Sequence, residues 1–316
     1  LSESESLAEL NIYNLPDLAD FDMAIIIDNG IDYNDIFDVL HEKCLKANIP
    51  FITTVHRTEK GSYVISDNTV GAYELVYYCI DELGCKDIAF IAGSENNPDS
   101  QLRLQIVKDV MKERGLVFSE DETRLCYTGW RLQGAADFAH VITERDLIPD
   151  IIICANDELA MALCTELGIL GVNVPGDVKV TGFDGSYFSK IFNPCITTVD
   201  QNFMKVGLEC ARLLLDVING CYVKSESIVG SKLVRRESTG EAPDKEVDLL
   251  RKNVGKESFS RRILEGTLSR KIAGLEKDIL SADSLERVTD NMKRSYAMFK
   301  QYEPGINWHE RMGIQR

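Results

Sequence analysis

Residues 156–201 read NDELAMALCTELGILGVNVPGDVKVTGFDGSYFSKIFNPCITTVDQ, and this stretch decides the fold. Asn156 precedes apolar residues at helical spacing and can cap a helix over 157–170. The run KVTGFDG (179–185) then predicts a buried strand that ends in Asp184, with a glycine on each side. A capped helix followed by a buried strand is typical of a chain that alternates helices and strands.

The same alternation extends in both directions, from about residue 21 to residue 240. Predicted strands lie at 23–28, 50–55, 62–66, 88–93, 124–129, 151–155, 179–185 and 232–237, and predicted helices at 35–47, 69–83, 100–114, 132–144, 157–170 and 202–219. Continuous apolar strands that alternate with helices indicate parallel sheets covered on both faces. The sequence therefore predicts an α/β protein. Ligands of such sheets bind beyond the carboxyl ends of the strands, so polar residues that follow the strands are the first candidates for a site.

Size and charge narrow the possible organisation and partners. The chain has 316 residues, 44% of them hydrophobic, which is too much for one compact core and predicts two lobes. The net charge is −16, yet residues 251–316 carry 14 basic and 9 acidic residues, so the excess acid lies in the body. An acidic body repels phosphate backbones, and we expect this chain itself to bind no nucleic acid.

The nine cysteines indicate a reducing compartment. Their number is odd, no CxxC occurs, and several lie in apolar runs, as Cys154 does in IIICAND. The four histidines have no second potential ligand at metal spacing, so we expect no disulfide framework, no metal and no cofactor. No apolar run reaches the length of a bilayer span and no leader opens the chain. These features predict a cytoplasmic protein that does not associate with membranes.

The chain also lacks the common catalytic signatures. It contains no P-loop, no GxGxxG, no HExxH and no GxSxG motif, and we predict that it is not an enzyme and has no catalytic residue.

What remains is a set of side chains suited to reversible polar binding. A carboxylate at Asp184 can accept hydrogen bonds from two neighbouring hydroxyl groups, and Asn156 offers both a donor and an acceptor. Arg103 is a charged donor at the start of a helix, and Trp130 offers a flat face for a sugar ring or a base. Each has a plainer alternative: Asn156 as a helix cap, Arg103 as a surface ion-pair residue and Trp130 as a core residue.

The motifs of residues 156–201 resemble the effector-binding domain of the lactose-repressor and galactose-repressor family. The shared hallmarks are ND opening a helix, a G-x-x-VP-x-DV turn, a V-x-GFD strand and then P-x-x-TTV-x-Q. SDNTVGAYELVYYCIDELGCKDIAFIAG (66–93) and LVRRES (233–238) resemble an earlier helix–strand segment and the closing strand of the same family. The resemblance covers roughly residues 20 to 240.

This resemblance implies a periplasmic-binding-protein-like fold with two α/β lobes, a ligand between them and three crossover segments. We expect a sensor domain over 1–240, with crossovers near Gly93–Ser94, Gln201–Asn202 and Gly230–Ser231. The expected N lobe is therefore about 1–93 and 202–230, and the expected C lobe about 94–201 and 231–240. Carried over by position, the implied ligand contacts are Arg103, Trp130, Asn156, Asp184, Gln201, Asp28 and His56.

The sequence departs from the family at both ends. The family's first strand, helix and second strand, and the helix-turn-helix DNA reader before them, are not among these 316 residues. After a polar linker at 241–255, apolar residues recur at three-to-four spacing over 256–316 and predict a helical tail that pairs as a coiled coil or packs back onto the body. A sensor followed by a long helix resembles bacterial signalling proteins with a C-terminal output, often a diguanylate cyclase, and residues 9–23 resemble their entry segment.

We therefore expect a non-catalytic, homodimeric sensor that binds a small polar effector, a sugar or sugar derivative, and transmits lobe closure to the tail. The alternative is the effector-binding core of a transcriptional repressor that lacks its DNA reader. A hydrolase or transferase would need a catalytic pair that the sequence does not show. A transport-binding protein would need export, which the unpaired cysteines disfavour.

Overall fold

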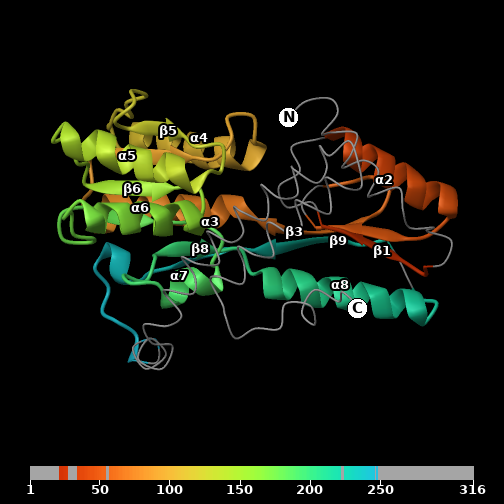
Figure 1. The fold of residues 1–316 in the computed structure, drawn as a ribbon. Helices are drawn as coiled ribbons and strands as arrows, with labels where there is room; N and C mark the ends of the chain where they lie inside the picture. The colour runs from red at the N-terminus through yellow and green to blue at the C-terminus, as the bar shows by residue number, and fades with distance from the viewer. Residues whose placement is uncertain (1–20, 28–33, 55–56, 222–223, 246, 248–316) are drawn as a thin grey trace, which may run out of the picture. The chain divides into compact units, whose positions relative to one another are not determined.

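The computed structural model describes residues 21–27, 34–54, 57–221, 224–245 and 247 (Figure 1). In chain order its elements are β1 (Ala24–Ile26), α2 (Asn34–Ala47), β2 (Phe51–Thr53), β3 (Ser62–Asp67), α3 (Asn68–Tyr77), a π-helical turn η2 (Tyr78–Glu82), β4 (Ile88–Ala92), α4 (Pro98–Glu113), β5 (Leu125–Tyr127), α5 (Leu132–Glu144), β6 (Ile151–Cys154), α6 (Asp157–Ile169), β7 (Lys179–Thr181), α7 (Tyr187–Ile191), β8 (Thr198–Asp200), α8 (Phe203–Ile218), β9 (Glu226–Gly230), β10 (Lys232–Val234) and a 3-10 turn η3 (Glu237–Thr239). These elements form the predicted α/β architecture.

The first sheet has the strand order β1-β2-β3-β9, and all of its strands are parallel. Successive residues of a strand point to opposite faces, and here Phe51 packs with Cys44 of α2, whereas Ile52 packs with Val206 of α8. Figure 1 shows α2 and α8 on opposite sides of this sheet. Both faces are therefore covered, as the apolar strands require.

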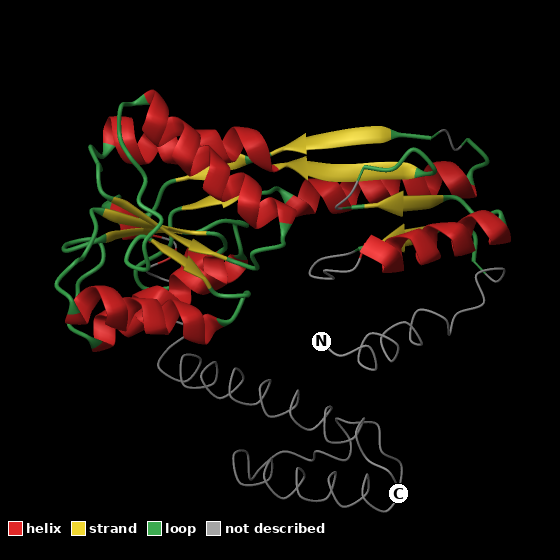
Figure 2. Ribbon diagram, turned by 90° about the horizontal axis from the view of Figure 1, so that it is seen from above, coloured by secondary structure: helices red, strands yellow, loops and turns green. Residues whose placement is uncertain are grey.

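The second sheet has the strand order β5-β4-β6-β7 and is also parallel. The chain adds β5 on one side of β4 and then β6 on the other, so right-handed crossovers place α4 and α5 on opposite faces. α3 packs beside α4, and α5 beside α6. Figure 2 shows the helices flanking the strands of each sheet. The largest apolar cluster lies here, around fully buried residues such as Phe90, Ile152 and Leu163.

The strand pairing corrects one predicted crossover. We expected the chain to leave the first lobe near Gly93–Ser94, but β4 pairs with β5 and β6, so the chain leaves the first sheet after β3, at Asp67–Asn68. The predicted N lobe of 1–93 is therefore too long. The reason is that the apolar residues of β4 predict a buried strand but do not indicate which of the two sheets the strand joins.

The other two crossings lie near β8 and β10, which form a small antiparallel sheet. β8 is followed at Gln201–Asn202 by α8, and Ser231 separates β9 from β10. The Ser231 hydroxyl donates to the Asp67 carbonyl and accepts a hydrogen bond from the Gly71 amide at 3.2 Å. A Cβ atom on Gly71 would lie 2.7 Å from that hydroxyl. The segment that follows β3 and the segment between β9 and β10 can therefore approach this closely only because residue 71 is glycine.

Some expectations fall on other parts of the chain. Contacts divide the chain into Leu1–Val247 and Asp248–Arg316, and the predicted helical tail at 256–316 and most of the predicted linker at 241–255 lie outside the described residues. Asp28 and His56 also lie outside them. Within the described part of the chain, no helix is long and apolar enough to cross a membrane.

Candidate functional site

Asp184 lies in a strained loop after β7. Its φ is +112°, which is uncommon for a residue with a side chain, and its amide donates to the Val199 carbonyl at 2.9 Å. The next residue, Gly185, has φ +70°, and a Cβ atom there would lie 2.7 Å from Asp200 Cα. The loop is thus pressed against β8 and holds the Asp184 carboxyl in one place. Backbone strain of this kind concentrates at ligand sites and supports a functional role.

Arg103, on α4, is a buried cation rather than the surface residue of the plainer alternative. Only 7% of its surface is exposed, and its guanidinium carbon lies 3.8 Å from the centre of the Phe183 ring. Its Nη1 atom donates to the Ala155 carbonyl at 2.5 Å. Among the described residues, Arg103 Nε has no hydrogen-bond partner. A buried donor without a partner is costly and marks a place where a bound acceptor would be stabilised.

The electrostatics of Asp184 follow from its surroundings. Burial raises the pKa of this carboxyl to about 7, against the lowering effect of Arg103 and with a further rise from Asp157. Gln201 Nε2 donates to Asp184 Oδ1 at 2.6 Å, which favours the charged form. The group therefore changes between acid and carboxylate near neutral pH, and it can offer a ligand either a donor or an acceptor.

Asp157 also belongs to this cluster; it is one of the polar residues that follow the predicted strands, but it was not among the predicted ligand contacts. Its side chain is fully buried, its Oδ2 atom accepts from the Ser186 amide at 2.7 Å, and its own amide donates to the Phe183 carbonyl at 2.7 Å. Burial raises the pKa of Asp157, and hydrogen bonds from Thr198, Ser186 and Ser189 lower it. Asp157 thus hydrogen-bonds to the backbone on both sides of Asp184, at Phe183 and at Ser186. The sequence signal was its place beside Asn156 in the ND pair.

Asn156 caps α6, as predicted. Its Oδ1 atom accepts from the Leu159 amide at 2.9 Å, and the backbone before the helix is extended. The cap uses the carbonyl oxygen of the side chain. Capping and ligand binding through the amide nitrogen are therefore compatible.

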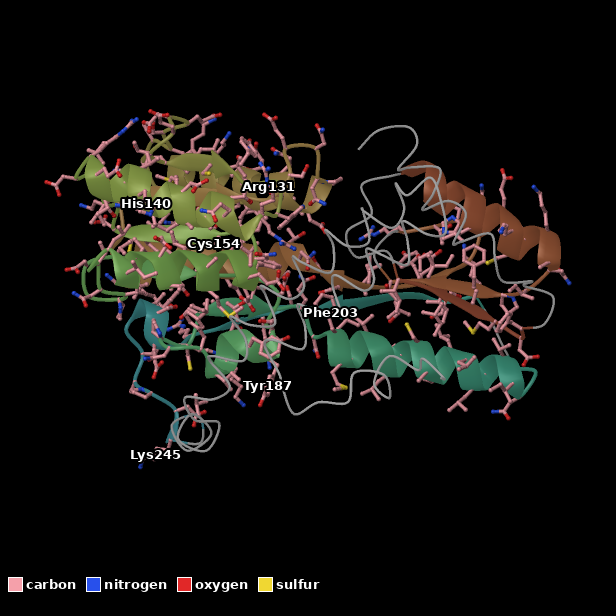
Figure 3. All side chains as sticks on the ribbon, viewed as in Figure 1. Arg131, His140, Cys154, Tyr187, Phe203 and Lys245 are labelled. Atoms are coloured by element: carbon pink, nitrogen blue, oxygen red, sulfur yellow. The ribbon has the colours of Figure 1, made fainter. Side chains whose placement is uncertain are left out.

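Trp130 follows β5 in a tight turn and is half-buried. Gly129 and Trp130 both have positive φ, +58° and +63°, and a Cβ atom on Gly93 would lie 2.3 Å from the indole ring. The ring therefore rests on the backbone at the end of β4, with its edge packed on the core as the plainer alternative foresaw. Figure 3 labels Arg131, which follows Trp130, and Cys154, at the end of β6.

The structure brings most of the described candidates to one edge of the second sheet. Gly93, Trp130, Asn156 and Asp184 follow the carboxyl ends of β4, β5, β6 and β7. Asp184 interacts with both Arg103 and Gln201, whereas the described contacts do not join Trp130 to Asp184. This is the edge at which parallel α/β sheets bind ligands.

Two parallel α/β sheets linked by three crossing segments define the class of periplasmic-binding-protein-like folds. A family model described as "Periplasmic binding protein-like domain" matches residues 80–239. The chain belongs to this family. It also resembles the effector-binding part of lactose-repressor-type regulators, as the sequence motifs predicted.

The related sequences are transcriptional repressors. The chain is 29% identical over 163 residues to the HTH-type transcriptional repressor PurR of Histophilus somni, which covers 49% of this chain and 46% of that protein. It is 27% identical over 178 residues to the HTH-type transcriptional repressor CytR of Escherichia coli, covering 56% and 51%. The chain thus spans about half the length of these relatives. They are regulators rather than enzymes, which supports the prediction of a non-catalytic protein.

Solved structures agree on the fold. A LacI-family regulatory protein from Chloroflexus aggregans matches with a TM-score of 0.62 and 22% identity, over 77% of this chain and 85% of that one. The transcriptional regulator CelR in complex with cellobiose matches at 0.58 and 26%, over 75% and 70%. A LacI-family regulator from Enterococcus faecium with bound ribose matches at 0.60 and 26%, over 74% and 86%.

Proposed function

We propose that this chain is the effector-binding core of a cytoplasmic transcriptional regulator, which works as a homodimer and binds a small polar effector of the sugar type. The repressors among its relatives favour this alternative over the sensor of a diguanylate cyclase. Effector binding would shift the equilibrium between two arrangements of the sheets, by as much as the effector's affinities for the two arrangements differ.

The observation that carries this proposal is the pair formed by the buried Arg103 and the partly buried Asp184. Within the described ranges Arg103 Nε has no hydrogen-bond partner, and the neighbouring Asp184 is held by Gln201 and by its own GFDG loop. A polyol fits this pair, because its hydroxyl groups both donate to a carboxylate and accept from a guanidinium. In our proposal Trp130 supplies an apolar face for the ring, and Asn156 and Gln201 supply further hydrogen bonds.

The relatives support an effector of this size and polarity. Two regulators that share 26% identity with the chain are described in complex with cellobiose and with ribose. Asp28 and His56 belong to the proposed contacts through the family resemblance alone.

A thermal-shift screen of the whole chain tests the proposal, with monosaccharides, disaccharides, nucleosides and nucleobases as probes. A true effector at about 100 times its Kd should stabilise the fold by about 2.7 kcal/mol. The shift should vanish in Arg103→Ala and Asp184→Ala, and it should persist in Arg145→Ala, which removes an exposed arginine of the same domain. A shift that survives both site variants would contradict the assigned site, and stabilisation by nucleobases alone would contradict the sugar class.

A second candidate function concerns the tail. Apolar residues recur at three-to-four spacing over 256–316, and this pattern supports a role for the tail in passing the effector signal to an output. Deleting the tail should leave the affinity for the effector unchanged and should abolish any change of oligomeric state that the effector causes. A loss of affinity on deletion would count against this role.

A further inference from the structure

α8 carries a second apolar stripe that the first sheet does not use. The helix packs on the sheet through Val206, Cys210 and Leu213. Four further large apolar residues, Met204, Leu208, Leu215 and Ile218, point away from the sheet, and their exposed fractions run from 57% for Leu215 to 76% for Met204. The exposed stripe comprises Met204, Leu208, Ala211, Leu215 and Ile218.

The spacing of this stripe is that of a helix-pairing seam. Its members recur at intervals of four, three, four and three residues, and they lie roughly 150° around the helix from the buried face. The stripe runs for about 21 Å along α8. A small residue, Ala211, stands at its midpoint and leaves room for the close approach of a second helix. Solvent-facing helix positions are ordinarily polar, so this stripe requires a partner surface.

The charges beside the stripe select the partner. Lys205, Glu209, Arg212 and Asp216 lie on one flank and alternate in sign along the helix. Arg212 already pairs with Glu209 at 3.0 Å and with Asp216 at 2.9 Å. From the N-terminal end of α8 the charges of this flank run positive, negative, positive, negative, and from the C-terminal end they run negative, positive, negative, positive. An antiparallel copy of α8 therefore sets Lys205 against Asp216 and Glu209 against Arg212, twice each.

An antiparallel two-fold pair also brings the matching flanks together. The two-fold axis then stands at right angles to both helices and passes near Ala211, so the charged flank of each helix lies on the same side of the seam. In a parallel pair the charged flanks would fall on opposite sides and could not meet. Met204 would face Ile218 and Leu208 would face Leu215 across the antiparallel seam.

We propose that α8 pairs with α8 of a second copy of this chain, antiparallel and centred on Ala211. One helix pair buries less surface than a typical stable dimer interface, so this contact is expected to associate weakly and to depend on concentration. The pairing is independent of effector binding and of any other dimer contact. It is tested by its register rather than by oligomeric state alone.

Disulfide trapping tests the register. In a Cys221→Ser background, which removes the exposed native thiol, Ala211→Cys should form a cross-linked dimer under mild oxidation, because residue 211 meets its own copy. Val117→Cys is the matched control, since Val117 is 89% exposed and lies in the loop between α4 and β5. We expect several-fold more cross-linked dimer from Ala211→Cys. Leu208→Cys and Leu215→Cys should cross-link efficiently only when the two variants are mixed.

Charge reversal provides an independent check. Arg212→Glu should reduce the trapped dimer of Ala211→Cys several-fold, and adding Glu209→Arg to the same chain should restore it, because the swap rebuilds each pair. Circular dichroism confirms that each variant is folded. Equal trapping at residues 117 and 211 would overturn the proposal. So would an Ala211→Cys thiol that neither cross-links nor reacts with a soluble thiol reagent, since the stripe would then be covered within its own chain.

Discussion

At the scale of single residues, Asp184 combines a positive φ, partial burial and a pKa of about 7. In the unfolded chain this carboxyl ionises near its ordinary pKa of 3.8, whereas in the folded chain it keeps its proton up to about pH 7. The folded state therefore binds more protons between these values, and this group's contribution to stability falls as the pH rises from about 4 to about 7. The strained backbone and the desolvated carboxyl thus occur at the same residue of the proposed site.

Asp184→Asn should remove that pH dependence. Asparagine tolerates a positive φ and keeps an oxygen for Gln201, but it does not ionise. We expect the variant to be more stable than the parent at about pH 8 by at least about 1 kcal/mol, since one pKa unit corresponds to about 1.4 kcal/mol. Chemical denaturation at about pH 5 and about pH 8 measures this. A parent chain whose stability is the same at both values would contradict the raised pKa.

The second prediction at this scale concerns Gly93. Gly93→Ala places a methyl group within 2.3 Å of the Trp130 ring, so the ring must move or the strand end must shift. We expect a loss of about 1–3 kcal/mol in stability, as for other overpacked positions. Trp130 fluorescence should change in a Trp308→Phe background, which leaves one tryptophan. Unchanged fluorescence would show that the ring does not rest on Gly93.

At the scale of the element, the cap of α6 separates two roles of Asn156. Asn156→Ala should cost about 1 kcal/mol because the Leu159 amide loses its acceptor, whereas Asn156→Ser keeps a capping oxygen and should keep most of the stability. Serine lacks the amide nitrogen, so effector affinity should fall several-fold in both variants. If Asn156→Ser binds the effector as tightly as the parent, capping is the whole role of this residue.

Element boundaries show what the sequence can and cannot predict. The helices at 132–144 and 157–170 agree closely with α5 and α6, because their apolar periodicity and their first residues are local signals. β8, β9 and α7 were missed. β9 is a largely exposed edge strand, and its single buried residue, Val229, is too weak a pattern to distinguish the strand from a loop.

The same limit applies to the site. Arg103 and Asp184 were predicted from the motif positions that resemble the family, and the structure brings them into one cluster. Phe183 and Asp157 were not among the predicted site residues, because their roles depend on packing between α4, β7 and α6. The sheet to which β4 belongs was mistaken for the same reason, since β4 pairs with residues 35 and 63 positions further along the chain and such pairing leaves no local trace.

At the scale of the whole molecule, Ser231 ties two crossing segments together. Ser231→Ala leaves the Gly71 amide and the Asp67 carbonyl without their shared partner, which should cost about 1–2 kcal/mol. Lys232→Ala, at the exposed neighbouring residue, should cost much less. Urea denaturation compares the two variants. Equal stability of the two would show that the link contributes little.

The pairing of β9 with β3 also determines when the protein can finish folding during its synthesis. Residues 226–230 complete the first sheet, yet the ribosome makes them after every strand of the second sheet. The nascent chain can therefore bury the apolar cluster around Phe90 and Ile152 while the edge of β3 that pairs with β9 is still unpaired. Translation that stalls between α8 and β9 would expose this edge to other nascent chains.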